Sequence, residues 1–272
     1  MTKICVDVMG SDKDPRELMS GLADALVSDS DLELLVVGDD EIVVPFAEAL
    51  DRAEALVSKS VIAMDERPAD AVRKKKDSSI VMAAKAVADG RAQGLFSAGS
   101  TGAVLTAATF GIGRIKGIKR PALSSPLPGL HGHKTVFLDL GANADVKPEA
   151  LVQFAHMGSA YARVALATRN PTVALLCNGS EDTKGSELAL SYHAALAADD
   201  TINFVGNAEG TDILTGSYDV IVSDGFTANV ALKTLEGTAK FISARIKEGV
   251  AASKRAALGA LLLKPTLKEI AA

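Results

Sequence analysis

The chain has 272 residues, of which 48% are hydrophobic and 23% are charged, and these proportions are typical of a soluble globular protein. Its formal net charge of −5 argues against general binding of nucleic acid, which requires a positive field. The chain has no run of about 18 apolar residues, so we expect no transmembrane helix. The N-terminus carries no apolar stretch of the signal-peptide type, and we therefore expect a cytoplasmic protein.

Short apolar runs and helical patterns alternate from the N-terminus onward. Asp14 followed by Pro15 predicts the start of a helix, with the aspartate as N-cap and the proline in the first turn. Another helix is expected after Pro45. In this first part, strands are expected at residues 4–8, 34–37 and 61–63.

The same alternation continues to the end of the chain. Long helices are predicted at residues 148–167 and 230–250, and the segment 120–132, rich in proline and glycine, is the clearest break. Strands are expected at residues 94–96, 135–138, 173–176, 202–205 and 220–222. Alternating strands and helices predict a three-layer α/β/α fold with a mainly parallel sheet. We expect one domain over residues 1–272, with a protruding helical hairpin near 240–272.

Five loops of glycine, serine, threonine and asparagine each follow an apolar run and precede a helical pattern. They comprise residues 97–102, 141–145, 178–185, 206–210 and 223–229. In an open α/β sheet, the loops at the carboxyl ends of the strands gather at one edge, where ligands bind. Helix N-termini offer free N–H groups to anions. The loops therefore predict a small-molecule site with phosphate-like character.

Lys184 is the cation of the third loop and precedes a helix that we expect to start near Ser186. A lysine beside backbone N–H groups at a helix N-terminus can bind phosphate or stabilise an oxyanion. The alternative is a surface lysine paired with Glu181 or Asp182.

The fifth loop offers Asn229, whose amide N–H could donate to a developing oxyanion. The alternative is that Asp224 and Asn229 cap the helix that follows. In the first loop, Ser100 and Thr101 resemble part of a phosphate cradle. That loop is not a P-loop, and no loop has the Gly-x-Gly-x-x-Gly pattern of a dinucleotide site.

Three further features are weaker candidates. His131 and His133 could hold a metal, but spacing suggests no third ligand. Cys177 could accept an acyl group, although a buried thiol is the simpler interpretation for it and for Cys5. The basic run at residues 73–76 is expected to be solvated and could attract an acidic protein.

Leucines gather near the end of the chain between basic residues. This apolar turn can pack in the core or against a second subunit, or it can contact a membrane surface. The residues expected to make such a membrane contact are Leu258, Leu261, Leu262 and Leu263.

The loops together resemble the PlsX family, the phosphate acyltransferases of bacterial phospholipid synthesis. The resemblance covers essentially the whole chain. It rests on residues 6–10, 73–79, 97–103, 138–143, 181–185, 204–210, 224–226 and 261–265. Ser11 and Ala228 stand where this family is expected to have glycine, and Ser100 where it has asparagine. The family usually continues beyond the position of Ala272, with a glycine-rich segment and a last helix.

This resemblance implies transfer of a fatty acyl group from acyl carrier protein to inorganic phosphate. It also implies a homodimer with a fold like phosphotransacetylases and isopropylmalate dehydrogenases, attached peripherally to the membrane and linked in function to a membrane glycerol-3-phosphate acyltransferase. A thioester has a good leaving group, so phosphate can attack it directly, and we expect neither a cofactor nor a metal.

On this interpretation Lys184 and Asn229 are the expected catalytic residues, because positioning of phosphate and stabilisation of the oxyanion are what the protein must supply. Phosphate and substrate are expected to contact Ser97, Gly99, Ser100, Thr101, Gly102, Asn143, Asn207, Asp224 and Gly225.

Two alternatives remain open from the sequence. The fold class would also permit a metal- and NAD-dependent dehydrogenase of the isopropylmalate type, which should need several aspartates around a metal. The basic and apolar end of the chain would also suit a non-catalytic, membrane-recruited binder of acyl carrier protein.

Overall fold

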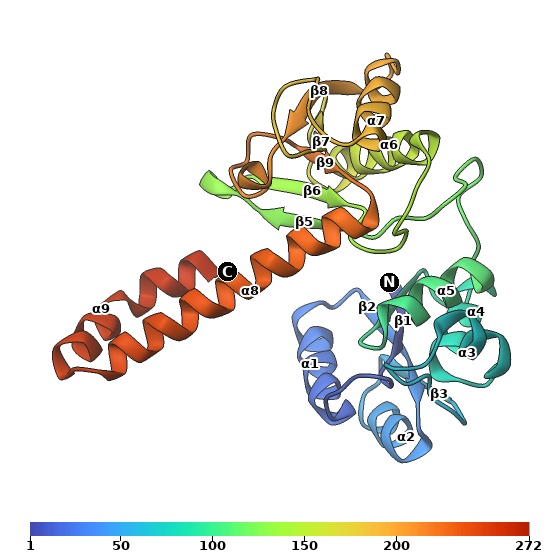
Figure 1. The fold of residues 1–272 in the computed structure, drawn as a ribbon. Helices are drawn as coiled ribbons and strands as arrows, with labels where there is room; N and C mark the ends of the chain where they lie inside the picture. Colours follow the sequence, from blue (N-terminus) through green and yellow to red (C-terminus); the bar gives the residue numbers. More distant parts are fainter. Residues whose placement is uncertain (272) are drawn as a thin grey trace. The chain divides into compact units, whose positions relative to one another are not determined.

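The chain forms two compact units, Met1–Pro121 and Ala122–Ala272, in the computed structural model (Figure 1). The structure describes the backbone of residues 1–271 and the side chains of residues 1–267. Residue 272, the last one of the expected domain and hairpin, lies outside the described residues. The boundary between the units falls in the segment 120–132, which the sequence marks as a break. The expected single domain stays a prediction, and each unit is described by itself.

Unit 1 is built on a four-stranded parallel sheet of order β3-β2-β1-β4. Its strands are β1 (Thr2–Asp7), β2 (Leu32–Gly38), β3 (Ala53–Val57) and β4 (Gly94–Ser97). Its helices are α1 (Pro15–Ser28), α2 (Asp40–Ala49), α3 (Pro68–Lys74), α4 (Ser79–Ala88) and α5 (Thr101–Gly111). The Asp14 carboxylate caps α1 by accepting from Arg16 N–H, as predicted.

Helices cover both faces of the sheet of unit 1. Because side chains alternate along a strand, Val6 and Val36 face α1 and α2, whereas Cys5 and Leu35 face alanines of α4. The small alanines let α4 lie close to the sheet. The result is a three-layer α/β/α unit.

The predicted third strand was wrong in position. The strand pairs with β2 at Ala53–Val57, and residues 61–63 are not a strand. Ile62 is nevertheless buried, in a cluster with residues of α3, α4 and α5. The apolar run at 61–63 thus reflects burial in a connecting segment, which a periodicity argument cannot distinguish from a short strand.

Unit 2 contains a five-stranded sheet of order β5-β6-β9-β7-β8, in which β5 is antiparallel to β6 and the other pairs are parallel. Its strands are β5 (Ser124–Pro128), β6 (Lys134–Leu138), β7 (Thr172–Leu176), β8 (Asn203–Ala208) and β9 (Val220–Val222). Its helices are α6 (Pro148–Ala165), α7 (Glu187–Ala197), α8 (Gly225–Ala251) and α9 (Lys254–Ala271), with single turns η1 (Leu130–Gly132) and η2 (Gly210–Asp212).

Both faces of this second sheet are also covered. Val136 and Leu138 pack against α6 and α7, while Phe137 and Ile221 pack against the first turns of α8. Each unit is therefore an α/β arrangement of parallel strands between helices, and the predicted fold class is confirmed.

The fourth glycine-rich segment is not a loop throughout. Gly206 and Asn207 belong to β8, at an irregularity where the register between β7 and β8 shifts. Gly206 has a φ of 101°, which only glycine adopts without strain. A glycine inside a strand here marks a bulge, not the end of the strand.

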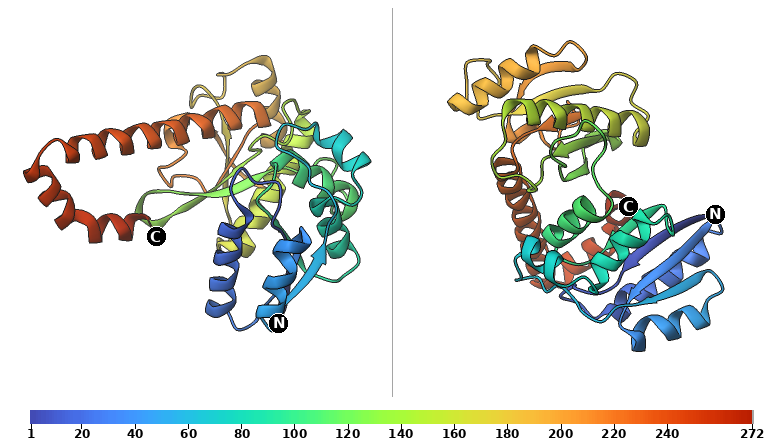
Figure 2. Two further views of the ribbon diagram at one scale, coloured as in Figure 1. Left: turned by 90° about the horizontal axis from the view of Figure 1, so that it is seen from below. Right: turned by 90° about the vertical axis from the view of Figure 1, so that its right-hand side faces the viewer.

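The last two helices form a hairpin that leads away from the sheet of unit 2 (Figure 2). The leucine-rich segment that we expected to be a turn is helical, because alanine and leucine are strong helix formers. Pro265 lies inside α9 and does not end it.

We predict that Gly158→Val destabilises the protein by about 1–3 kcal/mol, because the side chain would be overpacked. A Cβ at Gly158 would lie 2.5 Å from Cγ1 of Val220 and 3.0 Å from Cδ2 of Leu138. The measurement is the free energy of unfolding in denaturant.

Gly237→Ala is the control, because no heavy atom lies within 4 Å of a Cβ at Gly237 of α8. This change should raise stability by about 0.5–1 kcal/mol through helix propensity. Equal stability of the Gly158 variant and the wild type would contradict the close packing of α6.

Candidate functional site

The candidate residues of unit 2 gather at the carboxyl ends of its parallel strands. The loops after β6, β7 and β9 all leave this edge, and α7 and α8 begin there. This arrangement confirms that three of the predicted loops share one edge of a sheet. The loop at residues 97–102 belongs to unit 1 and is described separately.

The Asp139 carboxylate organises the loop after β6. It is fully buried and accepts hydrogen bonds from the backbone N–H groups of Leu123, Ala142 and Asn143, at 2.8–3.0 Å. A longer contact of 3.3 Å joins it to Gly141 N–H. A buried carboxylate is tolerated only where hydrogen-bond donors of the protein replace the water molecules that would solvate it, and this loop supplies such donors.

Asn143 is part of the same arrangement. Its Nδ2 donates to Asp139 at 2.8 Å, and its backbone carbonyl accepts from Gly225 N–H at 2.8 Å. A Cβ at Gly225 would lie 2.6 Å from that carbonyl oxygen, so only glycine allows α8 to begin so close to the loop. Asn143 and Gly225 thus join two loops of the candidate site.

Asn229 lies in the first turns of α8, and its Nδ2 donates to the carbonyl of Leu140 at 2.9 Å. The side chain is half-buried and lies against Gly141, where a Cβ would meet Nδ2 at 2.4 Å. Asp224, in contrast, is the N-cap of α8 and accepts from Thr227 N–H at 2.8 Å. The capping alternative is therefore correct for Asp224, whereas Asn229 bonds to the loop after β6.

Lys184 is exposed on the loop that leads into α7. Its N–H closes a turn onto Glu181 at 3.0 Å, and its side chain lies across Gly179, where a Cβ would be 2.8 Å from Cγ of Lys184. Among the described residues, no carboxylate pairs with its ammonium: Asp182 lies 3.6 Å from Nε2 of His193 instead. The sequence alternative of a pair with Glu181 or Asp182 is not what the structure has. As expected, Ser186 caps α7.

Asn207 holds this loop in place from β8. Its Nδ2 donates to the carbonyl of Glu181 at 2.9 Å, and its Oδ1 lies 3.0 Å from Nδ1 of His193. Because the amide oxygen can only accept, Nδ1 of His193 carries the hydrogen in this contact. Sequence reasoning missed His193, which lies on α7 next to no motif.

In unit 1, Ser97 and Gly99 are held by a buried carboxylate. Oγ of Ser97 donates to Asp7 at 2.7 Å and accepts from Gly99 N–H at 3.1 Å. Burial raises the pKa of Asp7, and hydrogen bonds from Ser79, Ser97 and Met9 N–H offset part of that effect. Asp7 ends an apolar strand, and a charge at such a position was the signal that could have identified it and Asp139.

The remaining residues of this loop begin α5. Ser100 is the N-cap position and makes no side-chain capping bond, and Thr101 is exposed. A Cβ at Gly102 would lie 2.7 Å from Cγ of Pro68, so this glycine lets α5 and α3 meet. A cavity of about 10 Å³ beneath the loop has room for no more than one water molecule. Binding of phosphate by this loop stays a prediction.

A larger pocket, with a volume of about 420 Å³, lies in unit 2 between the first turns of α7 and α8. Both ends of the loop that carries Lys184 approach it, because Asn178 and Gly185 line it. Cys177 lines it as well and contacts Asn178 at 3.5 Å. The pocket adjoins the loop of Lys184.

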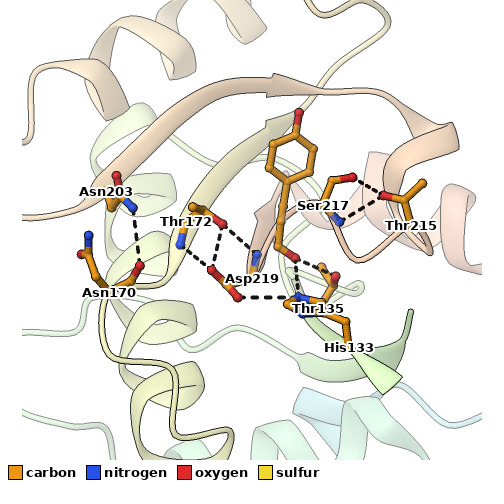
Figure 3. Close-up of polar contacts among 9 residues, drawn as sticks. His133, Thr135, Asn170, Thr172, Asn203, Thr215, Ser217 and Asp219 are labelled. Carbon is orange, nitrogen blue, oxygen red and sulfur yellow. Dashed lines mark hydrogen bonds and ion pairs between the residues drawn. The ribbon is translucent and has the colours of Figure 1, made fainter. Parts of the chain in front are cut away.

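The opposite edge of the sheet carries a separate polar network (Figure 3). Asp219 accepts from the backbone N–H of Thr172 at 2.8 Å and from its hydroxyl at 2.9 Å. His133 lies 3.3 Å from the carbonyl of Tyr218 and 3.6 Å from Asp219. These contacts join the amino ends of β6, β7 and β9.

Within the described part of the chain, no cluster of three His, Cys, Asp or Glu residues could hold a metal ion.

The candidate membrane residues are exposed on α9. Leu258, Leu261, Leu262 and Leu263 have 54–75% of their surface exposed. None of the described helices is both long and apolar enough to span a bilayer.

In the basic run at 73–76, Lys75 forms an ion pair with Glu66 at 2.6 Å, and its neighbours are exposed.

Solved structures share the arrangement of strands and helices. A phosphotransacetylase from Streptococcus pyogenes matches with a TM-score of 0.62 and 16% identity, over 88% of this chain and 82% of that one. The EutD phosphotransacetylase from Staphylococcus aureus matches with a TM-score of 0.59 and 16% identity, over 88% and 83%. At this identity the likeness establishes the fold alone: the chain has a phosphotransacetylase-like α/β fold.

Sequence comparison is more specific. Residues 2–272 match a family model described as "Fatty acid synthesis protein". A protein named phosphate acyltransferase from Bacillus pumilus is 46% identical over 268 residues, which are 98% of this chain and 80% of that protein. Another of the same name, from Heliobacterium modesticaldum, is 47% identical over 271 residues, with 98% and 80% covered. The chain belongs to the phosphate acyltransferase family.

The raised pKa of Asp7 predicts how pH affects stability. The folded state binds the proton of this carboxyl more tightly than the unfolded chain, in which the pKa of the carboxyl is 3.8. The contribution of Asp7 to the free energy of unfolding is therefore full below pH 3.8 and is lost as the pH rises through the folded-state pKa. Asp7→Asn should lack this decline when unfolding free energies are measured from about pH 3 to 7. Parallel curves for the two proteins would contradict the prediction.

Proposed function

We propose that the enzyme transfers a fatty acyl group from the thioester of acyl carrier protein to inorganic phosphate at the carboxyl edge of unit 2. The observation that carries the proposal is Lys184, a cation unpaired with any described carboxylate, on the loop that follows the half-buried Cys177 and adjoins an apolar pocket. Membership in the phosphate acyltransferase family supports the reaction and counts against the dehydrogenase alternative.

In the proposed reaction a phosphate oxygen attacks the carbonyl carbon of the thioester. The C–O bond forms, the tetrahedral oxyanion collapses and the C–S bond breaks. The products are acyl phosphate and the carrier thiolate, which takes a proton from solvent. Lys184 compensates the charge of phosphate or of the oxyanion, and Asn229 assists through the N–H that does not bond to Leu140.

Backbone donors of the loop after β6 are not available for this work. Those of Ala142 and Asn143 are already bound to Asp139. The side chains of Asn143 and Asn207 are likewise engaged within the protein. We therefore give these two asparagines the role of positioning residues, and we place the binding of phosphate at Lys184 and the start of α7.

A direct attack requires no enzymic nucleophile. Cys177 contacts Asn178 and, among the described residues, no histidine that could activate it. The thiol is therefore assigned to the wall of the pocket and not to a covalent step.

Lys184→Ala should lower the rate of phosphate-dependent thiol release from acyl carrier protein by about 10²–10³-fold, the usual effect of losing one oxyanion donor. Lys240→Ala, an exposed lysine of α8, is the matched control and should retain full activity. Normal turnover in the Lys184 variant, with an intact fold by circular dichroism, would refute the assignment.

We further propose that the hairpin of α8 and α9 serves two contacts. The exposed leucines of α9, flanked by Lys254 and Arg255, suit an anionic membrane surface. Phe241 and Ile246 of α8 are 66% and 59% exposed and suit the interface of a homodimer. A cytoplasmic enzyme held at the membrane in this way would deliver acyl phosphate to a membrane glycerol-3-phosphate acyltransferase.

Two double variants separate these contacts. Leu261→Glu with Leu262→Glu should release the protein from phosphatidylglycerol vesicles and leave it dimeric. Phe241→Glu with Ile246→Glu should yield monomers in sedimentation. Val164→Glu, at an exposed valine of α6, is the control and should change neither property. Vesicle binding that survives the first change, or dimers that survive the second, would contradict the respective contact.

A further inference from the structure

The pocket between α7 and α8 is apolar over most of its wall. Leu176 lines it from the end of β7, Ala189 and Tyr192 contribute from α7, and Ala231 contributes from α8. The hydroxyl of Tyr192 is already engaged, because it donates to the carbonyl of Val146 at 2.8 Å. The volume of about 420 Å³ lies within the range of about 300–1,000 Å³ that is usual for small-molecule sites.

Two polar side chains of the wall, Asp224 and Ser186, already have partners within the protein. Asp224 accepts from the N–H and the hydroxyl of Thr227, and Ser186 accepts from Ala189 N–H. Most of the wall therefore offers an occupant apolar surface, and a hydrocarbon chain would gain from covering it.

The rim of the pocket is unusual for a solvated surface. Leu188 of α7 and Val230 of α8 both line the pocket, and they are 42% and 52% exposed. Two aliphatic side chains on neighbouring helix starts, open to water above an apolar space, leave a surface that an apolar ligand would cover.

We propose that this pocket receives the acyl chain of the donor, with the thioester carbonyl at its Lys184 end. The inference rests on the proposed function, since it assigns the acyl part of that substrate. Gly185 and Ser186 line the pocket directly after Lys184, so a chain inside it brings its carbonyl to the loop that carries the cation. Selection of chain length then depends on how far α7 and α8 leave the pocket open.

The first test reduces the volume of the pocket. Ala231→Leu fills part of the pocket from α8, whereas Ala239→Leu makes the same change on the exposed surface of that helix. Each buried methylene is worth about fourfold in binding, so kcat/KM for a dodecanoyl donor should fall at least about tenfold relative to a butyryl donor. The control variant should keep the wild-type ratio.

A second pair of variants changes exposed leucines of α7 and leaves the interior of the protein unaltered. Leu188→Ser removes an exposed apolar rim residue, and Leu190→Ser is the matched change at an exposed leucine of α7 outside the pocket. The first should weaken selection for the longer chain without loss of folding, and the second should not. An unchanged ratio of dodecanoyl to butyryl activity in both pocket variants would overturn the proposal.

A binding measurement does not depend on turnover. Cys177 lines the pocket and is partly exposed, while Cys5, the other cysteine, is fully buried. Alkylation by N-ethylmaleimide therefore reports Cys177. Dodecanoate should slow this labelling several-fold in the wild type and not in Ala231→Leu, and butyrate should slow it in neither.

The two measurements separate the proposals. Phosphate-dependent thiol release with an unaltered chain-length profile, and no protection of Cys177, would overturn the pocket and leave the proposed function standing. Protection of Cys177 by dodecanoate alone, without thiol release from any donor, would overturn the proposed function and support the pocket.

Discussion

The arrangement of the carboxyl edge of unit 2 depends on one buried carboxylate. Asp139 has no exposed surface, and the N–H groups that stabilise its charge come from the loop that follows β6. That loop in turn accepts from Gly225 at the start of α8 and holds Asn229 through Leu140. A charge that must be satisfied inside the protein thus fixes the positions of two loops and a helix.

The same principle recurs around the other loops. Asp7 binds the loop after β4 in unit 1, and Asn207 with His193 binds the loop of Lys184 in unit 2. In each case a buried or half-buried polar group binds a glycine-rich segment: Asp7 accepts from Ser97, whereas Asn207 donates to the carbonyl of Glu181. Lys184 is notable because no carboxylate of the described chain competes for it.

Periodicity and helix signals predicted most of the fold, including α1 with its Asp14 cap and α6 from Pro148. They do not distinguish two structures that give the same pattern: the buried segment around Ile62 has the apolar run of a strand, and Gly206 has the glycine typical of a loop but lies in β8. The loops of the candidate site were identified from composition alone. Their supporting residues were not, because the partners of Asp139 or His193 are known only once the chain is folded.

Pro265 in α9 limits how the hairpin can meet an apolar phase. Proline has no N–H, so the carbonyl of residue 261 lacks the usual helical donor. Water can satisfy that oxygen at an interface, whereas the hydrocarbon interior of a bilayer offers it nothing. In the proposed membrane contact, α9 should therefore rest at the depth of the lipid headgroups, with its leucines inserted and its backbone still hydrated.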